Sequence, residues 1–186
     1  DDIDELVALL LPVADRVRAA VACACASRLL PIYDAHGSGD ARVLKHALEG
    51  AWAWAQGGSV PSDLEASAET VEEYVEAHYE EEDELLASVA NAVRMALAVV
   101  EAEGDTDASA LEAARTLVLD ADLSDMVDGV LADAGASTTA DAEEEAWRER
   151  IVELARRWRG PVDRTKFEGA SSPPSWMPDF VAAYGG

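Results

Sequence analysis

Basic residues are scarce in this chain. Lys and Arg together number 14 against 38 Asp and Glu, which gives the 186 residues a formal net charge of −24. Such an acidic surface repels nucleic acid and anionic membranes, and it attracts basic partners. We therefore expect a basic protein partner, and neither nucleic acid nor membrane. Solubility or adaptation to salt is the alternative explanation of the charge.

Cysteine and long apolar runs are also rare. The two cysteines, Cys23 and Cys25, would point about 200° apart on a helix, so they can neither bond each other nor share a metal there. A reducing, cytoplasmic environment is the simplest inference. No apolar run approaches the roughly 20 residues of a membrane span. The acidic first residues, Asp1 to Glu5, also differ from the basic start of a signal peptide.

Aromatic residues make up only 6% of the chain, while hydrophobic residues, with many alanines, reach 49%. Alanine is the best helix former, whereas strands favour β-branched and aromatic residues. This composition predicts an all-α, single-domain bundle of about seven helices, mostly antiparallel, within residues 1–160. Residues 161–186 are predicted to form an extended, Pro-rich tail. Trp176 and Phe180 would anchor it on the bundle; the alternative is a tail that trails from it.

The central helix is predicted within residues 16–33, RVRAAVACACASRLLPIY, the least acidic and most Ala- and Cys-rich part of the chain. Its small residues allow neighbouring helices to approach closely. We expect the helix to cover Val13–Leu30 and Pro31 to stop or kink it. An arginine in so apolar a helix needs a carboxylate, so Arg28 is expected to pair with one at a helix end. Its role would be structural rather than catalytic.

Helical spacing and capping residues predict the other helices. They cover Asp4–Leu11, Ala41–Gln56, Leu64–Tyr79, Leu85–Glu101, a helix with Leu111–Val118, a short helix ending near Ala134, and Ala142–Arg159. Expected caps are Asp107 or Ser109 for the helix that follows them, and Thr139 or Asp141 for the last long helix. Trp52 and Trp54 lie on different faces of their helix, so one is expected in the core and the other over a neighbouring groove.

The negative charge is concentrated in the middle of the chain. Residues 59–145 hold 25 acids against Arg94 and Arg115, a net charge of −23. The five adjacent acids of Glu80–Glu84 predict an exposed helix end or a break. An acidic face of this kind can mimic nucleic acid and fill the cleft of a basic partner. The predicted partner-binding residues are the acids of this stretch: Glu76, Glu80, Glu81, Glu82, Asp83 and Glu84.

Motifs of catalysis and metal binding are largely absent. The three histidines lie in neither a Glu-x-x-His nor a His-Glu-x-x-His pattern. His78 and Glu82 stand one helical turn apart, but a run of charge is usually a solvated face. The segment DADLSDMVDG has acids like a calcium loop, yet Asp125 and Leu131 replace the required Gly and Glu. Its acids are therefore interpreted as a solvated helix start: Asp120, Asp122, Asp125 and Asp128.

No metal, no cofactor and no catalysis are therefore predicted. Ser-His-Asp or Cys-His catalysis stays open as an alternative, because such groups meet only in three dimensions. An enzyme would need a cleft that gathers His36, His46 or His78 with carboxylates. Both cysteines are expected to be small buried hydrophobic residues.

Several segments resemble one bacterial family. ACACASRLLPIYD, Ala22–Asp34, looks like the A-x-x-x-E-R-L-L-P-x-Y signature of the family called domain of unknown function 416 (YjaG-like), with Ser27 where that signature has Glu. ALEGAWAWAQGG, Ala47–Gly58, resembles its ALD-x-x-W-x-W segment. Residues 85–101 and EEEAWRERIVELAR, Glu143–Arg156, are similar to its later helices. The corresponding signature residues here are Arg28, Pro31, Trp52 and Trp54.

This resemblance implies a cytosolic all-α fold and no established activity. It covers about four fifths of the chain, and the Pro-rich tail has no counterpart in it. A weaker likeness, carried by Arg28-Leu-Leu-Pro and Trp54-Ala-Gln-Gly, is to small all-α immunity proteins of bacterial toxin systems. Three hypotheses follow: an acidic protein-binding module such as an immunity protein against a basic toxin, a housekeeping or regulatory protein that forms a homo-oligomer, and an enzyme.

Overall fold

The computed structural model describes residues 2–36, 41–136, 139–170 and 173–184. Within these ranges all regular structure is helical, in nine helices and no strand, which confirms the predicted all-α fold. The helices are α1 (Ile3–Leu10), α2 (Asp15–His36), α3 (Ala41–Ala55), α4 (Leu64–Glu80), α5 (Glu84–Glu101), α6 (Thr106–Asp133), α7 (Ala140–Arg157), α8 (Arg164–Ala170) and α9 (Met177–Tyr184).

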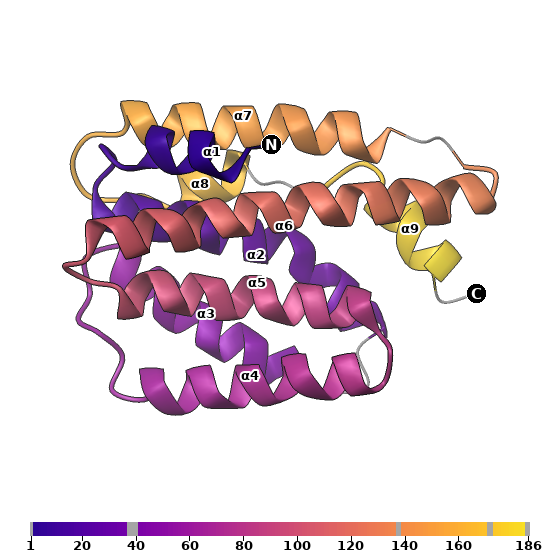
Figure 1. Ribbon diagram of the computed structural model, residues 1–186, viewed down its shortest axis with the longest axis horizontal. Helices are drawn as coiled ribbons and strands as arrows, with labels where there is room; N and C mark the ends of the chain where they lie inside the picture. Colours follow the sequence, from indigo (N-terminus) through magenta and orange to yellow (C-terminus); the bar gives the residue numbers. More distant parts are fainter. Residues whose placement is uncertain (1, 37–40, 137–138, 171–172, 185–186) are drawn as a thin grey trace.

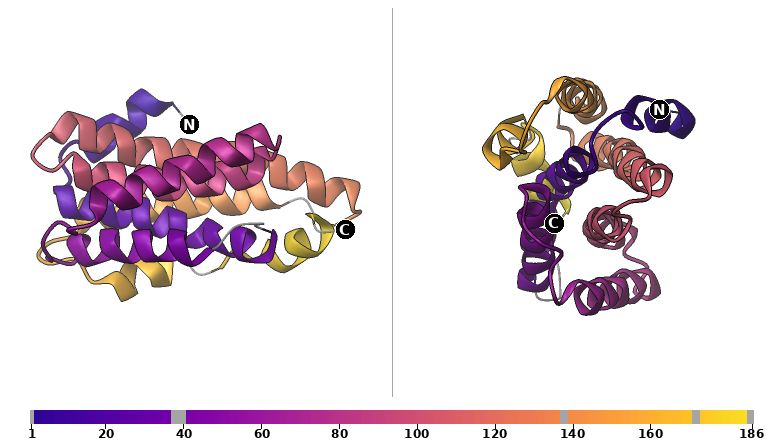
Figure 2. Two further views of the ribbon diagram at one scale, coloured as in Figure 1. Left: turned by 90° about the horizontal axis from the view of Figure 1, so that it is seen from below. Right: turned by 90° about the vertical axis from the view of Figure 1, so that its left-hand side faces the viewer.

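The helices form two layers. In Figure 1, α4, α5 and α6 run side by side and antiparallel in front, and α2 and α3 lie behind them. The end-on view of Figure 2 shows the same division, with α8 and α9 on the side of α2, and with α1 and α7 together beside α6. The helix α4 therefore forms one edge of the bundle, far from α7.

The helix α2 is the centre of the bundle. Fifteen of its 22 residues are buried, and it contacts α3, α5, α6, α7, α8 and α9. A helix that is apolar all round is buried on all sides, as the sequence of this one predicts. Pro31 was predicted to stop or kink this helix; it does not stop it, since α2 continues to His36. Burial of the apolar residues around Pro31, such as Leu29 and Ile32, offsets the lost backbone hydrogen bond.

The acidic run of residues 80–84 interrupts the helical structure between α4 and α5, as predicted. The helix α4 ends at Glu80 and α5 begins at Glu84. Glu82 adopts a left-handed conformation with φ of 59°, and its amide donates to the carbonyl of Tyr79. The next amide, of Asp83, donates to the carbonyl of His78. These two bonds satisfy the last carbonyls of α4 and turn the chain sharply into α5.

The helix α6 differs from its prediction. Residues 106–133 form one helix of 28 residues, where two were expected. Its cap is Asp105, whose carboxylate accepts from the amide of Ala108 at 3.0 Å, rather than Asp107 or Ser109. The start of α7 is capped from outside: Asp128 of α6 accepts from the amides of Ala140 and Asp141 at 2.9 and 3.1 Å. Thr139 makes no side-chain capping bond there. A cap supplied by another helix leaves no local sequence signal.

Both tryptophans of α3 are buried, whereas the sequence predicted one in the core and the other over a neighbouring groove. Trp52 is 0% and Trp54 1% exposed. The indole of Trp52 donates to Ser27 Oγ at 3.2 Å. The Arg16 guanidinium lies 4.5 Å from the ring centre of Trp54, and that of Arg164 lies 5.1 Å from the ring centre of Trp52. The helix α3 is covered by α2, α4 and α5, which leaves neither ring a free face.

The C-terminal segment is partly helical instead of extended. Trp176 and Phe180 are 4% and 0% exposed and meet edge-to-face, with ring centres 5.8 Å apart. Pro178 falls in the first turn of α9, where proline is tolerated because the first amides of a helix have no partner. Arg164 of α8 forms a two-bond ion pair with Glu49 of α3, at 2.6 Å for each bond. Burial of the aromatic rings stabilises helices that are too short to form alone.

Candidate functional site

The helix α4 lies at the edge of the bundle (Figure 1), and an acidic groove runs along it. Its volume is about 770 Å³. Apolar and polar residues of the segment before α4 close one end. The lining residues are Val60, Pro61, Ser62, Leu64, Glu65, Ala68, Glu69, Glu72, Glu73 and Glu76, with Arg94 and Glu101 of α5. Six of these twelve side chains are glutamates.

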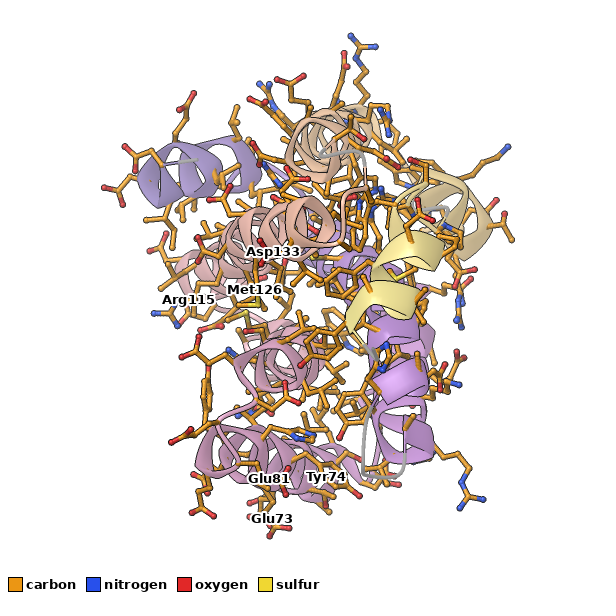
Figure 3. All side chains as sticks on the ribbon, turned by 90° about the vertical axis from the view of Figure 1, so that its right-hand side faces the viewer. Glu73, Tyr74, Glu81, Arg115, Met126 and Asp133 are labelled. Atoms are coloured by element: carbon orange, nitrogen blue, oxygen red, sulfur yellow. The ribbon has the colours of Figure 1, made fainter. Side chains whose placement is uncertain are left out.

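The glutamates lie in this groove because of the helical period of α4. Leu64, Ala68 and Val71 are buried and hold one face of the helix against the bundle. Glutamates at positions 65, 69, 72, 76 and 80 repeat every three or four residues, so they share another face. At 1.5 Å per residue this stripe is about 22 Å long. Figure 3 shows Glu73 on the outer side of α4, away from the other helices.

Most of this charge is uncompensated. Arg94 is the single cation among the lining residues, and its guanidinium pairs with Glu72 at 2.9 Å and Glu101 at 3.2 Å. Within the described parts of the chain, no ion pair involves the other four glutamates of the lining, which are Glu65, Glu69, Glu73 and Glu76. Four like charges on one exposed helix face attract cations.

The predicted partner-binding residues continue this surface onto the turn after α4. Glu76 lines the groove, and Glu80, Glu81, Glu82 and Glu84 are exposed. Asp83 is different, because it is half-buried and its carboxylate has partners within the chain. Asp83 Oδ1 accepts from the amide of Leu86 at 3.0 Å and from the hydroxyl of Tyr184 at 2.9 Å. Asp83 therefore caps α5 and links it to α9 through the hydrogen bond with Tyr184.

Four further glutamates of the groove, Glu65, Glu69, Glu72 and Glu73, are not among the predicted partner-binding residues. The sequence does carry a signal for them, because they follow the helical period of α4 on a face other than its apolar one. Arg94 and Glu101 belong to the groove because α5 packs against α4, and no local feature of the sequence indicates this.

His78 does not face solvent with Glu82. Its side chain is buried, and Nε2 lies 2.7 Å from the hydroxyl of Tyr33 on α2. Its Nδ1 has no hydrogen-bond partner and lies 3.6 Å from a carboxylate oxygen of Glu81. Burial, together with the nearby Tyr74 and Glu81, raises the pKa of Tyr33 to about 12, so its phenol stays neutral. This pair joins α2 to α4 behind the acidic turn.

The other two histidines have separate partners. His36 Nε2 lies 2.8 Å from the carbonyl oxygen of Val181, and His46 Nε2 lies 2.8 Å from a carboxylate oxygen of Asp63. Over the described residues, no group of three or more His, Cys, Asp or Glu side chains is arranged to hold a metal ion. Burial raises the pKa of both thiols, Cys23 and Cys25, so neither is an activated nucleophile.

A second polar feature lies inside the bundle, where Arg28 of α2 meets the first turns of α7. Its Nε and Nη2 donate to the two carboxylate oxygens of Glu144 at 2.8 and 2.7 Å. This is the carboxylate at a helix end that the sequence predicted. Trp176 Nε1 donates to the same carboxylate at 3.0 Å, and the Arg28 guanidinium lies 5.2 Å from the ring centre of Trp147.

The acids of residues 120–128 are not a solvated helix start, because they lie in the second half of α6. Asp120 is 1% exposed and accepts from Arg148 Nη1 of α7 at 2.9 Å. Asp128 caps α7, whereas Asp122 and Asp125 are exposed. Two buried ion pairs, Arg28–Glu144 and Arg148–Asp120, therefore join α2, α6 and α7. We call these four residues the buried charge cluster.

Comparisons with family models, curated proteins and solved structures found no match. The likeness to domain of unknown function 416 and to immunity proteins stays a prediction. Across the described ranges, no helix has the length and apolar character needed to cross a membrane. The chemistry of the surface is therefore the basis for a functional proposal: a long groove that can bind cations, on a helix at the edge of the bundle.

Proposed function

We propose that this protein is a binding module whose acidic groove and acidic turn take up a basic segment of another protein. The observation that supports this proposal is the groove of about 770 Å³, in which Glu65, Glu69, Glu73 and Glu76 pair with no cation among the described residues. Lysines and arginines spaced three or four residues apart on a partner helix would match this stripe. Neither catalysis nor a cofactor is part of the proposal.

An immunity protein that neutralises a basic toxin in the bacterial cytoplasm is the specific form that we propose. A stripe of about 22 Å matches the length of several phosphate spacings on nucleic acid, so it could occupy a cleft built for a nucleic-acid backbone. The weaker likeness of the Arg28 and Trp54 segments to immunity proteins agrees with this reading. Charge of this density also accelerates association with a cationic partner.

The first experiment is a pull-down from the native host at low salt, followed by elution with rising salt. We expect one basic protein to elute at moderate salt, because ion pairs across an interface weaken as salt screens them. An empty pull-down would contradict the immunity reading. The housekeeping hypothesis would then gain weight, with sedimentation as the test for a homo-oligomer.

The second experiment locates the interface. The triple variant Glu69→Lys, Glu73→Lys, Glu76→Lys reverses three groove charges that pair with no cation in the described part of the chain. Asp122→Lys, Asp125→Lys, Asp133→Lys is the matched control, because it changes the net charge equally on exposed positions of α6. We expect the groove variant to weaken binding of the captured protein at least tenfold and the control to weaken it only a few fold. Equal weakening by both variants would show an effect of net charge, and the groove would not be the site.

A further inference from the structure

Asp120 in the buried charge cluster has an unmatched atom. Its side chain is 1% exposed, and Oδ2 accepts from Arg148 Nη1 at 2.9 Å. Its other oxygen, Oδ1, is buried and has no hydrogen-bond partner. A buried carboxylate oxygen without a donor is costly, because burial removes it from bulk solvent and no protein group replaces the lost hydrogen bonds. Such an atom needs an explanation.

A second buried acid, Glu144, offers that explanation. Glu144 is also 1% exposed, and donors already reach both of its oxygens, two from Arg28 and one from Trp176. The Glu144 carboxyl is close enough to the Asp120 carboxyl to act on it by charge and as a hydrogen-bond partner. Two carboxylates in contact repel strongly away from water, whereas a carboxylic acid donates to a carboxylate.

The surrounding charges favour one proton in this place. Asp120 lies near Glu144 and Arg148 of α7. Arg28 and Cys25 of α2 belong to the same group of interacting side chains. Burial and the Glu144 carboxylate raise the pKa of Asp120 well above its ordinary value, against the opposing effect of Arg148.

Arg28 also lies 3.7 Å from a carboxylate oxygen of Glu143. Glu143 therefore adds a second carboxylate beside the Arg28 guanidinium.

We propose that Asp120 and Glu144 hold one proton between them in the folded protein, carried on Asp120 Oδ1 and donated to Glu144. This proton locks α6 to α7 inside the bundle. Because Glu144 also accepts from Trp176, the same proton supports the attachment of the C-terminal segment. The lock is independent of the acidic groove, which lies at the opposite edge of the bundle, along α4.

The lock has a defined pH dependence. A group whose pKa is higher in the folded state than in the unfolded state stabilises the fold at low pH, and this stabilisation is lost as pH rises through the folded pKa. We therefore expect the unfolding equilibrium constant to rise by up to about tenfold per pH unit from this group, starting above the ordinary Asp range. Deprotonation would weaken the contacts of Glu144 with Asp120 and Trp176 together.

Infrared spectroscopy of the folded wild-type protein at neutral pH tests the proton directly. We expect a carbonyl band of a protonated carboxylic acid that shifts when aspartate is labelled with carbon-13 at its carboxyl group. The band should be lost in Asp120→Asn and kept in Asp125→Asn, which changes an exposed acid of the same helix. Absence of the band, or its persistence in Asp120→Asn, would overturn the proposal. The labelled wild-type protein decides the question even if Asp120→Asn does not fold.

Urea unfolding between pH 5 and pH 9 is the second readout. Wild type and Asp125→Asn should lose stability with rising pH through this site. Asp120→Asn should lose less, because its amide keeps a donor for Glu144 at every pH. Equal pH profiles of Asp120→Asn and wild type would contradict the lock, since a merely structural role of Asp120 would lower stability without changing its pH dependence.

Discussion

Arg28 shows how one residue can connect most of the fold. Its guanidinium joins α2 to Glu144 of α7, and Glu144 in turn accepts from Trp176 ahead of α9. Both members of the pair are almost fully buried. Replacing such a pair by hydrophobic residues can be neutral, but removal of one partner leaves an uncompensated buried charge. The stability that depends on Arg28 is therefore a property of the pair.

We expect Arg28→Ala to lower the free energy of unfolding by about 3–5 kcal/mol, because it leaves Glu144 buried without its cation. Urea denaturation measures the change. Arg157→Ala is the matched control: Arg157 pairs with Glu153 on the exposed face of α7, with 78% of its side chain accessible. Its removal should change the stability by less than about 1 kcal/mol. A similar loss in both variants would show that burial of the Arg28 pair is energetically unimportant.

Among the connections between helices, the one from α4 to α5 is unusual, because a residue other than glycine occupies the left-handed position after the helix. The helices α3 and α6 are followed by Gly57 and Gly135 in left-handed conformations, with φ of 106° and 74°. The same pair of backbone bonds closes α4, but Glu82 occupies the left-handed position. This conformation is unfavourable for a residue with a Cβ, whereas glycine adopts it freely. The chain therefore keeps an acid where a glycine would be more stable.

We expect Glu82→Gly to raise the free energy of unfolding by up to about 1 kcal/mol through relief of this conformation. Gly135→Ala is the mirror control and should lower it by a similar amount, since it introduces a Cβ at a left-handed position. Thermal and urea unfolding of both variants measure these effects. If Glu82→Gly were destabilising, the Glu82 side chain would have to make a stabilising contact that outweighs its backbone.

For the whole molecule, charge is the dominant surface property. A formal charge of −24 on 186 residues causes self-repulsion in the compact state, and residues 59–145 carry nearly all of it. Their helices α4, α5 and α6 lie together in one layer, as Figures 1 and 2 show. The repulsion is therefore concentrated on one side of the bundle.

We expect stability to increase with salt. Between 0.01 and 1 M NaCl the screening length falls from about 30 Å to about 3 Å, which removes most repulsion between exposed acids. The urea midpoint should therefore rise with NaCl. A variant with Glu65, Glu69, Glu73 and Glu76 changed to Gln should respond less, because it carries less repulsion. If the urea midpoints of both proteins rose equally with NaCl, the repulsion would not come from the glutamates of α4.

The fold class and most of the long helices follow from the sequence alone. Alanine-rich composition and helical spacing predicted an all-α protein, the central position of the segment now seen as α2, and the break at residues 80–84. These features are local: helix propensity, period and capping act within a few residues. The prediction that Arg28 pairs with a carboxylate is confirmed by Glu144, because an unpaired buried charge is strongly unfavourable.

Contacts between residues far apart in the chain depend on how the helices pack. Nothing near Asp120 in the chain shows that Arg148 and Glu144 lie beside it, so its burial was mistaken for solvation. His78 was placed at the surface for the same reason, and the cap of α7 by Asp128 comes from another helix. Burial by neighbouring helices also allows α2 to continue past Pro31. Burial of Trp176 and its neighbours stabilises the short helix α9. Packing of whole faces outweighs local propensity wherever several helices cover one segment.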